Sequence, residues 1–436
     1  MVDLTAIFAF MDGLCQQVLT NSIAHLKSQQ SLTKEAAMRT QTEILIIGAG
    51  PTGMALSIAL HQAGVDHLLL DRLSEGQNTS RAAVIHAQTL DSLATLGVTD
   101  QLVARGLKVG NFTVRDRDAA LVRLRFDALP SGHPYLLMLP QDMTEEVLAA
   151  RIATLGGIIH RGVTATRVEQ DGTGARVRVN GPDGEHVISA RYVVGADGMH
   201  SVVRQATGIG FEGGTYEDSF VLADVRLEWP LGQSEVSLFF SPAGLVVVAP
   251  LPDGSYRVVA TMDNAPEQLS KSDIQAVLDS RGPQASNATV LDVLWSSRFR
   301  LHHRLANSYR RGRLILMGDA AHVHSPAGGQ GMNTGLIDAV VLGETLAGIV
   351  GRNRPETTLD LYESLRRPAA AKVLGLAGRL TDMATTRSIF KRAARNALLS
   401  FVNLAPVVKR QIEMNLSGLS RAELAHLPEY EYRHAA

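Results

Sequence analysis

The sequence predicts an α/β fold in which a parallel sheet flanked by helices is joined to a second, antiparallel sheet and to C-terminal helices. Three observations predict this fold. A short apolar run is followed at once by a glycine-rich turn, and two later apolar runs also end in polar turns. Between the second and the third of these runs, strand-like segments alternate with tight turns from residue 211 to residue 299.

Composition limits the classes of function. The 436 residues are 45% hydrophobic and 19% charged, as in an ordinary globular protein. The 42 lysines and arginines balance 43 acidic residues, which argues against nucleic acid as a partner. The single cysteine, Cys15, cannot form an internal disulfide and favours a reducing compartment, so we expect a cytoplasmic protein and predict no metal site. No run of about 18 apolar residues occurs, so no transmembrane segment is expected.

Residues 1–40 form an N-terminal extension ahead of the first motif. Its apolar run Leu4–Met11 is flanked by acidic residues and lacks a basic start, unlike a secretion signal. Apolar residues at loose helical spacing predict one or two amphipathic helices, namely Ile7, Leu14, Val18, Ile23 and Leu26. We expect an accessory role for this extension. The alternative is that it is upstream sequence ahead of a start at Met38.

The first motif is a strand, a glycine-rich turn and a helix. The run Thr42–Ile47 is typical of a strand buried on both faces, and a helix is expected over residues 54–63. In the turn between them, Gly48 permits the tight bend, Gly50 lets a pyrophosphate approach the backbone, and Gly53 lets helix and strand pack closely. The helix N-terminus then offers N–H groups to the phosphates.

The next strand adds an acidic residue at the distance that a dinucleotide site requires. Residues 66–71 form this strand, and Asp71 stands 21 residues after Gly50, where a carboxylate can accept hydrogen bonds from a ribose. The combination predicts a Rossmann-like, dinucleotide-binding domain rather than a mere tight turn. It leaves open whether the dinucleotide is NAD(P) or FAD.

Two further polar turns follow at strand ends. After helices expected over 81–96 and from Gln141 onward, a meander of three strands (165–170, 175–180 and 186–190) leads to a separate strand at 192–195. That strand ends in Asp197 and Gly198, with Arg204 on the following helix. The strand at 313–317 ends in Gly318 and Asp319, and a glycine-rich stretch through Asn333 opens a long helix. In a parallel sheet these strand ends face one crevice, where ligands bind.

In this order, the three motifs in residues 42 to about 375 resemble the class A FAD-dependent aromatic hydroxylases typified by para-hydroxybenzoate hydroxylase. The resemblance implies that the glycine motif binds the ADP half of FAD, that the Asp-Gly motif serves FAD or NAD(P)H, and that the Gly-Asp motif holds the ribityl chain. Carried over residue by residue, the predicted cofactor-binding residues are Gly48, Gly50, Pro51, Thr52, Gly53, Asp71, Arg72, Arg81, Gln141, Asp197, Gly198, Arg204, Gly318, Asp319, Pro326, Gly329, Gly331, Met332 and Asn333.

The resemblance also implies individual roles near the flavin ring. Asp319 would bind a ribityl hydroxyl, Pro326 would lie beside the isoalloxazine, and residues 329–333 would present backbone N–H groups to its pyrimidine edge. A carboxylate suits a chain of hydroxyl donors because it only accepts hydrogen bonds. The alternatives are that Asp197 or Asp319 caps a helix, and that Arg204 holds the Asp-Gly turn. His322 is expected to be structural.

The stretch 211–299 is predicted to be an antiparallel, substrate-binding sheet with strands at 219–229, 234–241, 244–250 and 255–262. Asp224, Arg226 and Glu228 alternate to one face, which is expected to be solvated. The predicted domains are an extension (1–40), a discontinuous FAD-binding domain (41–210 and 300–355, with 110–135 on the substrate side), the substrate sheet (211–299) and C-terminal helices (356–436). The basic and apolar segment 385–416 is expected to pack over the substrate sheet, with a peripheral membrane patch as the alternative.

The resemblance implies a flavin monooxygenase. NADPH or NADH would reduce FAD, O2 would add at the flavin C4a position, and the hydroperoxide would transfer one oxygen atom to an aromatic or polyketide-like substrate. The apolar sheet, without an evident anion clamp, favours a sizeable, largely apolar phenol over a small aromatic acid. The alternatives are a reductase or oxidase on the same scaffold without oxygen insertion, and a non-catalytic FAD-binding interaction protein. The sequence identifies no catalytic acid or base and predicts no oligomeric state.

Overall fold

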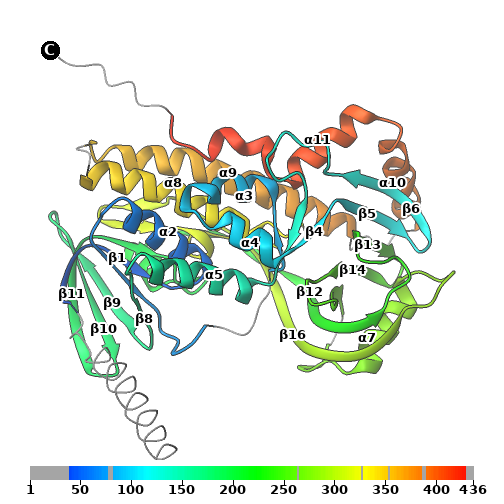
Figure 1. Ribbon diagram of the computed structural model, residues 1–436, viewed down its shortest axis with the longest axis horizontal. Coiled ribbons are helices and arrows are strands. Elements are labelled where there is room, and N and C mark those ends of the chain that lie inside the picture. The colour runs from blue at the N-terminus through cyan, green and yellow to red at the C-terminus, as the bar shows by residue number, and fades with distance from the viewer. Residues whose placement is uncertain are drawn as a thin grey trace, which may run out of the picture. The chain divides into compact units, whose positions relative to one another are not determined.

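The structure is a computed structural model that describes residues 39–76, 82–262, 265–325, 328–351, 354–384 and 389–428. The predictions for the N-terminal extension up to residue 38, for Arg81 and for Pro326 therefore lie outside the described residues. The described residues from Thr42 onward form one compact unit. Within it, the predicted α/β fold with a second, antiparallel sheet and C-terminal helices is confirmed (Figure 1).

The first sheet carries the predicted motifs on its central strands. β1 pairs in parallel with β2, β2 with β8, and β11 with β18. β9 and β10 extend this sheet as an antiparallel meander on β11. The strand order is β17 (Arg310–Arg311), β18 (Leu314–Leu316), β11 (Gly184–Gly195), β1 (Gln41–Ile47), β2 (His67–Leu70) and β8 (Ile159–His160), with β9 (Thr164–Gln170) and β10 (Ala175–Gly181) beside β11.

Strand β11 corrects one sequence prediction. The two strands expected at 186–190 and 192–195 are a single strand of 12 residues, Gly184–Gly195. Its first half pairs antiparallel with β10 and alternates between exposed and buried residues, whereas its last four residues are all buried, and Val193–Gly195 pair in parallel with β18. One strand therefore belongs to both the meander and the central sheet. Its burial pattern changes near residue 191 because the paired strand changes from β10 to β18, and the strand itself does not end there.

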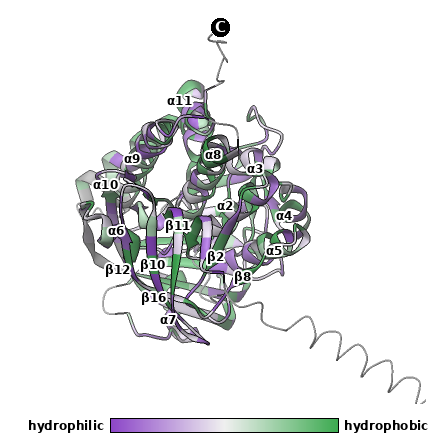
Figure 2. Ribbon diagram, turned by 90° about the vertical axis from the view of Figure 1, so that its left-hand side faces the viewer, coloured by the Kyte–Doolittle hydropathy of each residue, from purple (hydrophilic) through white to green (hydrophobic). Residues whose placement is uncertain are grey.

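Helices cover the central sheet. α2 (Pro51–Gln62) begins with a proline in its first turn, as helices favour, and packs against α8 (Gly331–Gly351), which lies beside α9 (Thr358–Ala384). Figure 2 shows α2 and α8 next to each other above β11 and β2. α8 is long and apolar enough to cross a membrane, but 78% of its most apolar stretch is buried inside the protein, as expected of a core helix.

The helix predicted over 81–96 is shorter than expected. Val84–Ile85 form strand β3, and the helix α3 starts only at Ala87 and runs to Leu93, before a short 3-10 turn η1 (Ala94–Leu96). β3 is extended because it pairs with β7 (Leu136–Met138), which also pairs with β4 (Leu107–Val109). The remaining helices of this region are α4 (Thr99–Arg105), α5 (Gln141–Thr154) and α6 (Val202–Thr207).

The antiparallel sheet forms where the sequence predicted it, with two differences. β12 begins at Phe211 rather than near 219, and β16 (Thr289–Ala306) is a strand that the sequence did not predict. These two strands of 18 residues pair with each other along most of their length. The strand order is β19 (His322–Val323), β16 (Thr289–Ala306), β12 (Phe211–Glu228), β15 (Tyr256–Thr261), β14 (Gly244–Pro250), β13 (Glu235–Ser241), β5 (Asn111–Asp116) and β6 (Ala119–Arg125).

The two faces of this sheet bury separate apolar clusters. One face packs Phe239 and its neighbours under α7 (Lys271–Arg281), whose first turn is fixed by a capping box between Ser270 and Asp273. The other face packs against the C-terminal helices α9, α10 (Ile389–Val402) and α11 (Pro406–Leu416) and the 3-10 turn η3 (Leu419–Leu424). The expectation that the C-terminal helices cover the sheet agrees with this packing.

Candidate cofactor-binding and active site

The three predicted turns lie at one edge of the central sheet. Their strands are neighbours in the order β18, β11, β1, and the turns are hydrogen-bonded to one another at their roots. The N–H of Ala196 donates to the carbonyl oxygen of Ile47 at 2.8 Å, and the N–H of Met317 donates to that of Gly195 at 3.1 Å. The structure thus brings the glycine, Asp-Gly and Gly-Asp motifs together, as parallel strands require.

The glycine turn has the geometry that a pyrophosphate needs. Gly48 has a φ of +105°, and a Cβ built on Gly53 would overlap the carbonyl oxygen of Gly48, so these two positions require glycine for the fold itself. A Cβ on Gly50 would meet no atom within 4 Å. Gly50 is the N-cap residue of α2, so no side chain accepts a hydrogen bond from the first N–H groups of the helix. No acidic residue stands in its first turn. This helix N-terminus therefore fits an anionic ligand.

Asp71 lies against the glycine turn. Its carboxylate accepts the N–H of Ala49 at 2.6 Å and the N–H of Leu73 at 2.8 Å, so it fixes the path of the loop. A carboxylate has further lone pairs, and a ribose contact remains a prediction. Arg72 is exposed beside it.

The Asp-Gly motif is organised around α6. Oδ2 of Asp197 accepts the N–H of Val202 at 2.8 Å, and its Oδ1 is buried with no partner in the described part of the chain. Burial raises the pKa of Asp197, while hydrogen bonds from Ser201 and from the start of α6 oppose this rise. The N-cap residue of α6 is Ser201, whose side chain accepts the N–H of Arg204 at 3.0 Å, and Asp197 accepts N–H groups from the first turn of that helix.

Arg204 connects the Asp-Gly turn to the Gly-Asp turn. Its guanidinium donates to the carbonyl oxygens of Met199 at 2.6 Å and Ala320 at 2.8 Å, and it stacks 3.8 Å from the ring centre of Phe211. The side chain is 8% exposed. Its described contacts hold the Asp-Gly and Gly-Asp turns together. They agree with the alternative that Arg204 holds the Asp-Gly turn.

The Gly-Asp turn is the short helix η2 (Gly318–Ala320). Gly318 has a φ of +56°, and its Cα approaches Thr52 of α2 closely enough that a Cβ would meet Oγ1 at 3.0 Å. Asp319 is exposed at the turn, beside buried Gly318 and Ala320. An exposed carboxylate at a turn can accept hydrogen bonds from the hydroxyl groups of a ligand.

We predict that Asp319→Ala gives folded protein with FAD affinity reduced about tenfold to a hundredfold, because one charged hydrogen bond to a hydroxyl is lost. Asp319→Asn should lose less, since it keeps one acceptor oxygen. Flavin titration followed by fluorescence measures both. Full flavin retention by Asp319→Ala after dialysis would show that this carboxylate does not contact the cofactor.

Asp338 on α8 forms a buried charge cluster behind this turn. Its side chain is fully buried and accepts hydrogen bonds from the N–H of Gly318 at 3.1 Å, from His322 Nε2 at 2.6 Å and from Arg366 Nε at 2.8 Å. Burial raises the pKa of Asp338, but the charges of His322 and Arg366 outweigh burial and lower it. His322 is thus part of a structural ion pair, consistent with the role expected for it.

The loop before α8 is shaped by positive φ angles and by Asn333. Gly328 and Gly329 have φ of +83° and +63°. The Asn333 amide donates to the carbonyl oxygens of Gly329 at 2.8 Å and Val84 at 2.9 Å. Its side-chain oxygen accepts the N–H of His86 at 2.8 Å. The predicted contacts of Gly331 and Met332 with a flavin use the backbone of the first turn of α8, which this network holds in place.

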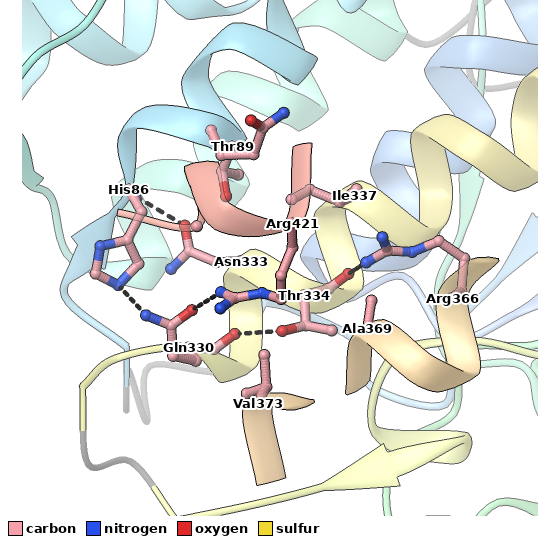
Figure 3. Close-up of a pocket in the computed structure, with 12 residues that line it drawn as sticks. His86, Thr89, Gln330, Asn333, Thr334, Ile337, Arg366, Ala369, Val373 and Arg421 are labelled. Carbon is pink, nitrogen blue, oxygen red and sulfur yellow. Dashed lines mark hydrogen bonds between the residues drawn. The ribbon is translucent and has the colours of Figure 1, made fainter. Parts of the chain in front are cut away.

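A polar row runs from this loop to the C-terminal turn η3. Gln330 contacts His86 Nε2 at 3.1 Å, and its Oε1 accepts from Arg421 at 2.9 Å (Figure 3). Burial lowers the pKa of Arg421 to about 10. These residues line a cavity of about 20 Å³, which is room for one water molecule and not for a substrate.

His86 should make the protein sensitive to acid. Burial lowers its pKa to about 4, with the Arg421 charge adding to this effect and the Gly328 carbonyl opposing it. Since the unfolded pKa is about 6.5, the unfolded chain binds a proton first as pH falls, so stability is full above about pH 6.5 and decreases by up to about 3 kcal/mol toward pH 4. Urea denaturation at neutral and acidic pH measures this loss, which His86→Gln should reduce. An unchanged pH dependence in His86→Gln would contradict it.

A second ion pair connects the antiparallel sheet to the cofactor loops. Arg257 on β15 holds Asp224 on β12 with two hydrogen bonds of 2.7 Å, and it donates to the carbonyl oxygen of Ala82 at 2.9 Å. The N–H of Gln141 donates to the same carbonyl at 3.0 Å. The prediction that the face carrying Asp224 is solvated is therefore wrong at Asp224. Arg226 is exposed as expected, but Asp224 pairs with an arginine whose side chain is 3% exposed.

Sequence reasoning missed His86, Arg257, Asp338, Arg366 and Arg421. His86, Arg257, Asp338 and Arg366 are buried and Arg421 is partly buried; the partners of each are distant in the chain, and none belongs to a local motif. The only local signal was the position of Gln330 inside the glycine-rich stretch. Among the described residues, no group of three or more His, Cys, Asp or Glu side chains could hold a metal ion.

Comparison with known proteins identifies close relatives of the chain. The profile of a family described as FAD binding domain matches residues 41–377. A 12-dehydrotetracycline 5-monooxygenase/anhydrotetracycline 6-monooxygenase of Streptomyces rimosus subsp. rimosus is 38% identical over 76% of this chain and 68% of its own length. The solved structure of OxyS anhydrotetracycline hydroxylase from Streptomyces rimosus matches with a TM-score of 0.73 and 33% identity, over 87% of this chain and 76% of that one. The Diels-Alderase PyrE3 of pyrroindomycin biosynthesis matches with a TM-score of 0.74 and 28% identity, over 87% and 80% of the two chains.

Proposed function

Since the chain belongs to the FAD binding domain family of flavoprotein monooxygenases, we propose that it hydroxylates a sizeable, largely apolar aromatic or polyketide-like substrate. The predicted class of enzyme is confirmed: the chain is an FAD-dependent monooxygenase that uses NAD(P)H. The identity of the substrate, the choice between NADH and NADPH and the roles of single residues are our proposals.

The residues at the strand ends fit FAD. Bound there, FAD would supply the redox chemistry of the reaction, namely hydride uptake from NAD(P)H and activation of O2. We assign the pyrophosphate to the N-terminus of α2 at Gly50, because only there does the turn leave open space beside a helix N-terminus without a side-chain cap. Asp319 would accept hydrogen bonds from the ribityl hydroxyls, and the first turn of α8 would hold the flavin ring and stabilise negative charge on it.

The protein's own residues then fix the geometry of the site. Arg204 holds the Asp-Gly and Gly-Asp turns in register, and Asp338 holds Gly318. Asn333 holds the loop at Gly329 against β3. Rigid loops of this kind orient a cofactor without reorganisation when charge develops.

The apolar face of the antiparallel sheet carries the proposal for the substrate. A Cβ on Gly328 would lie 3.5 Å from Leu380 and 3.6 Å from Leu416, so the loop assigned to the flavin borders the apolar cluster beneath α9–α11. That cluster includes Phe220, Phe240, Leu245, Val247, Val259 and Phe299 from the sheet. Such a wall excludes water and selects substrates by shape and apolar area.

The relatives support a polycyclic substrate. Two of the similar proteins act, by name, on anhydrotetracycline. We propose that this chain also acts on a polycyclic substrate, without assigning anhydrotetracycline itself to it. The cytoplasm remains our proposal for its location, on the basis of the single cysteine.

The same fold occurs in a protein named as a Diels-Alderase, so oxygen insertion should be measured directly. We expect NADH or NADPH oxidation by the yellow holoenzyme to accelerate with polycyclic phenols and the product mass to increase by one oxygen atom. Coupled turnover only with small aromatic acids would contradict the proposed substrate class.

A further inference from the structure

The helices α10 and α11 contact the protein through both apolar and polar side chains. On α10, polar side chains face the protein: the Arg395 guanidinium donates to the carbonyl oxygen of Met383 at 2.8 Å and stacks 4.3 Å from the ring centre of Phe240. The Asn396 amide donates to Asp116 at 2.6 Å, and the Asn403 amide donates to the carbonyl oxygen of Leu121 at 2.7 Å. Polar contacts therefore attach α10 to β5, β6 and β13.

The opposite side of these helices exposes large apolar side chains. Phe390 is 88% exposed, Leu404 is 78% exposed and Val407 is 83% exposed. Leu398, Phe401 and Val408 belong to the same surface, at 64%, 62% and 48%. These six residues, here called the outer apolar face, account for six of the ten exposed large hydrophobic residues in the described part of the chain. So dense a patch marks an interaction surface.

Basic residues lie in the same two helices. The sequence of residues 389–416 holds five lysines and arginines against the single acid Glu413. Arg395 is buried against Phe240, whereas Lys409 and Arg410 on α11 are partly exposed. Glu413 is 6% exposed and accepts the N–H of Arg125 at 2.9 Å, so it does not offset the surface charge. The exposed apolar side chains of α10 and α11 are therefore accompanied on α11 by the positive charges of Lys409 and Arg410.

We propose that the outer apolar face binds an anionic membrane surface, with α10 and α11 lying in the plane of the headgroups. Apolar side chains enter the boundary of the acyl chains, and flanking lysine and arginine attract anionic headgroups. A second copy of the chain is the less suitable partner, because a two-fold contact would bring the same basic residues close to one another. Figure 1 shows α10 and α11 at the upper right of the ribbon, near β5 and β6.

The test is binding of the full-length holoenzyme to vesicles, followed by co-sedimentation. We expect binding to vesicles of phosphatidylcholine and phosphatidylglycerol in equal parts, weaker binding to phosphatidylcholine alone, and release by high salt. Leu404→Glu and Val407→Glu should each weaken binding about tenfold or more, because each removes inserted apolar area and adds repulsive charge. Both side chains are already exposed, so the variants should keep their flavin.

Matched controls are Val187→Glu on β11 and Leu291→Glu on β16, which are exposed apolar positions outside these helices, at 46% and 49%. They should bind vesicles as the unchanged protein does. Failure of the unchanged protein to bind anionic vesicles, or equal binding by Leu404→Glu, would overturn the proposal. Concentration-dependent self-association that Leu404→Glu abolishes, without any vesicle binding, would instead identify a second copy as the partner.

Discussion

Gly50→Ala is expected to yield folded protein that has lost most of its FAD, with cofactor affinity reduced at least about tenfold to a hundredfold. The glycine has an ordinary backbone conformation, and a Cβ there would meet no protein atom within 4 Å, so the fold tolerates alanine. The added methyl group instead occupies the space assigned to the pyrophosphate. Flavin content after dialysis, read from the visible spectrum, and thermal unfolding of the apoprotein measure the two effects separately.

Gly53→Ala is the matched control three residues along the same turn. Its Cβ would overlap the carbonyl oxygen of Gly48, so the backbone must shift and the protein should be destabilised whether or not FAD is present. Gly50→Ala protein that stays fully yellow would show that the pyrophosphate does not approach this turn. Equal unfolding of both variants would show that the turn matters only for the fold.

Asp338→Ala should lower the free energy of unfolding by about 3–5 kcal/mol, because it leaves the buried guanidinium of Arg366 without its charged partner. Arg366 is 2% exposed and cannot turn to solvent without moving α9. The change also removes the acceptor for the N–H of Gly318, so any FAD bound by the surviving folded protein should be held more weakly. Urea unfolding of the apoprotein gives the stability, and flavin titration gives the affinity.

Asp360→Ala on α9 is the control for this measurement. Its side chain is 71% exposed and lies 3.9 Å from Arg310, and surface pairs of this kind contribute little. We expect a change within about 0.5 kcal/mol. If Asp338→Ala changed the free energy of unfolding as little as Asp360→Ala, the stability of the fold would not depend on Asp338 neutralising the charge of Arg366.

The local motifs could be predicted because each depends on neighbouring residues. The turn at 48–53 needs glycine for reasons that lie within the turn or directly beside it, and the three strand ends follow from apolar runs that parallel sheets require. The antiparallel strands β13, β14 and β15 start and end within about two residues of their predicted bounds, because turn residues separate them.

The features that the sequence did not predict depend on distant partners. Residues 84–85 form a strand only because β7 lies beside them, and β11 is continuous only because β10 and β18 pair with its two halves. Arg257 and Asp224 stand on two adjacent strands, β15 and β12, and Arg421 and Gln330 are 91 residues apart in the sequence. No local pattern encodes such contacts, so the buried polar groups of the site came from the structure alone.

Turnover under isotopically labelled O2 tests the central claim most directly. With NADH or NADPH as the electron donor and a polycyclic phenol as the substrate, we expect a product that carries one labelled oxygen atom, no turnover without O2, and faster coenzyme oxidation when the substrate is present. A product formed without O2, or one that carries no label, would contradict hydroxylation by this chain and would favour a reductase on the same scaffold.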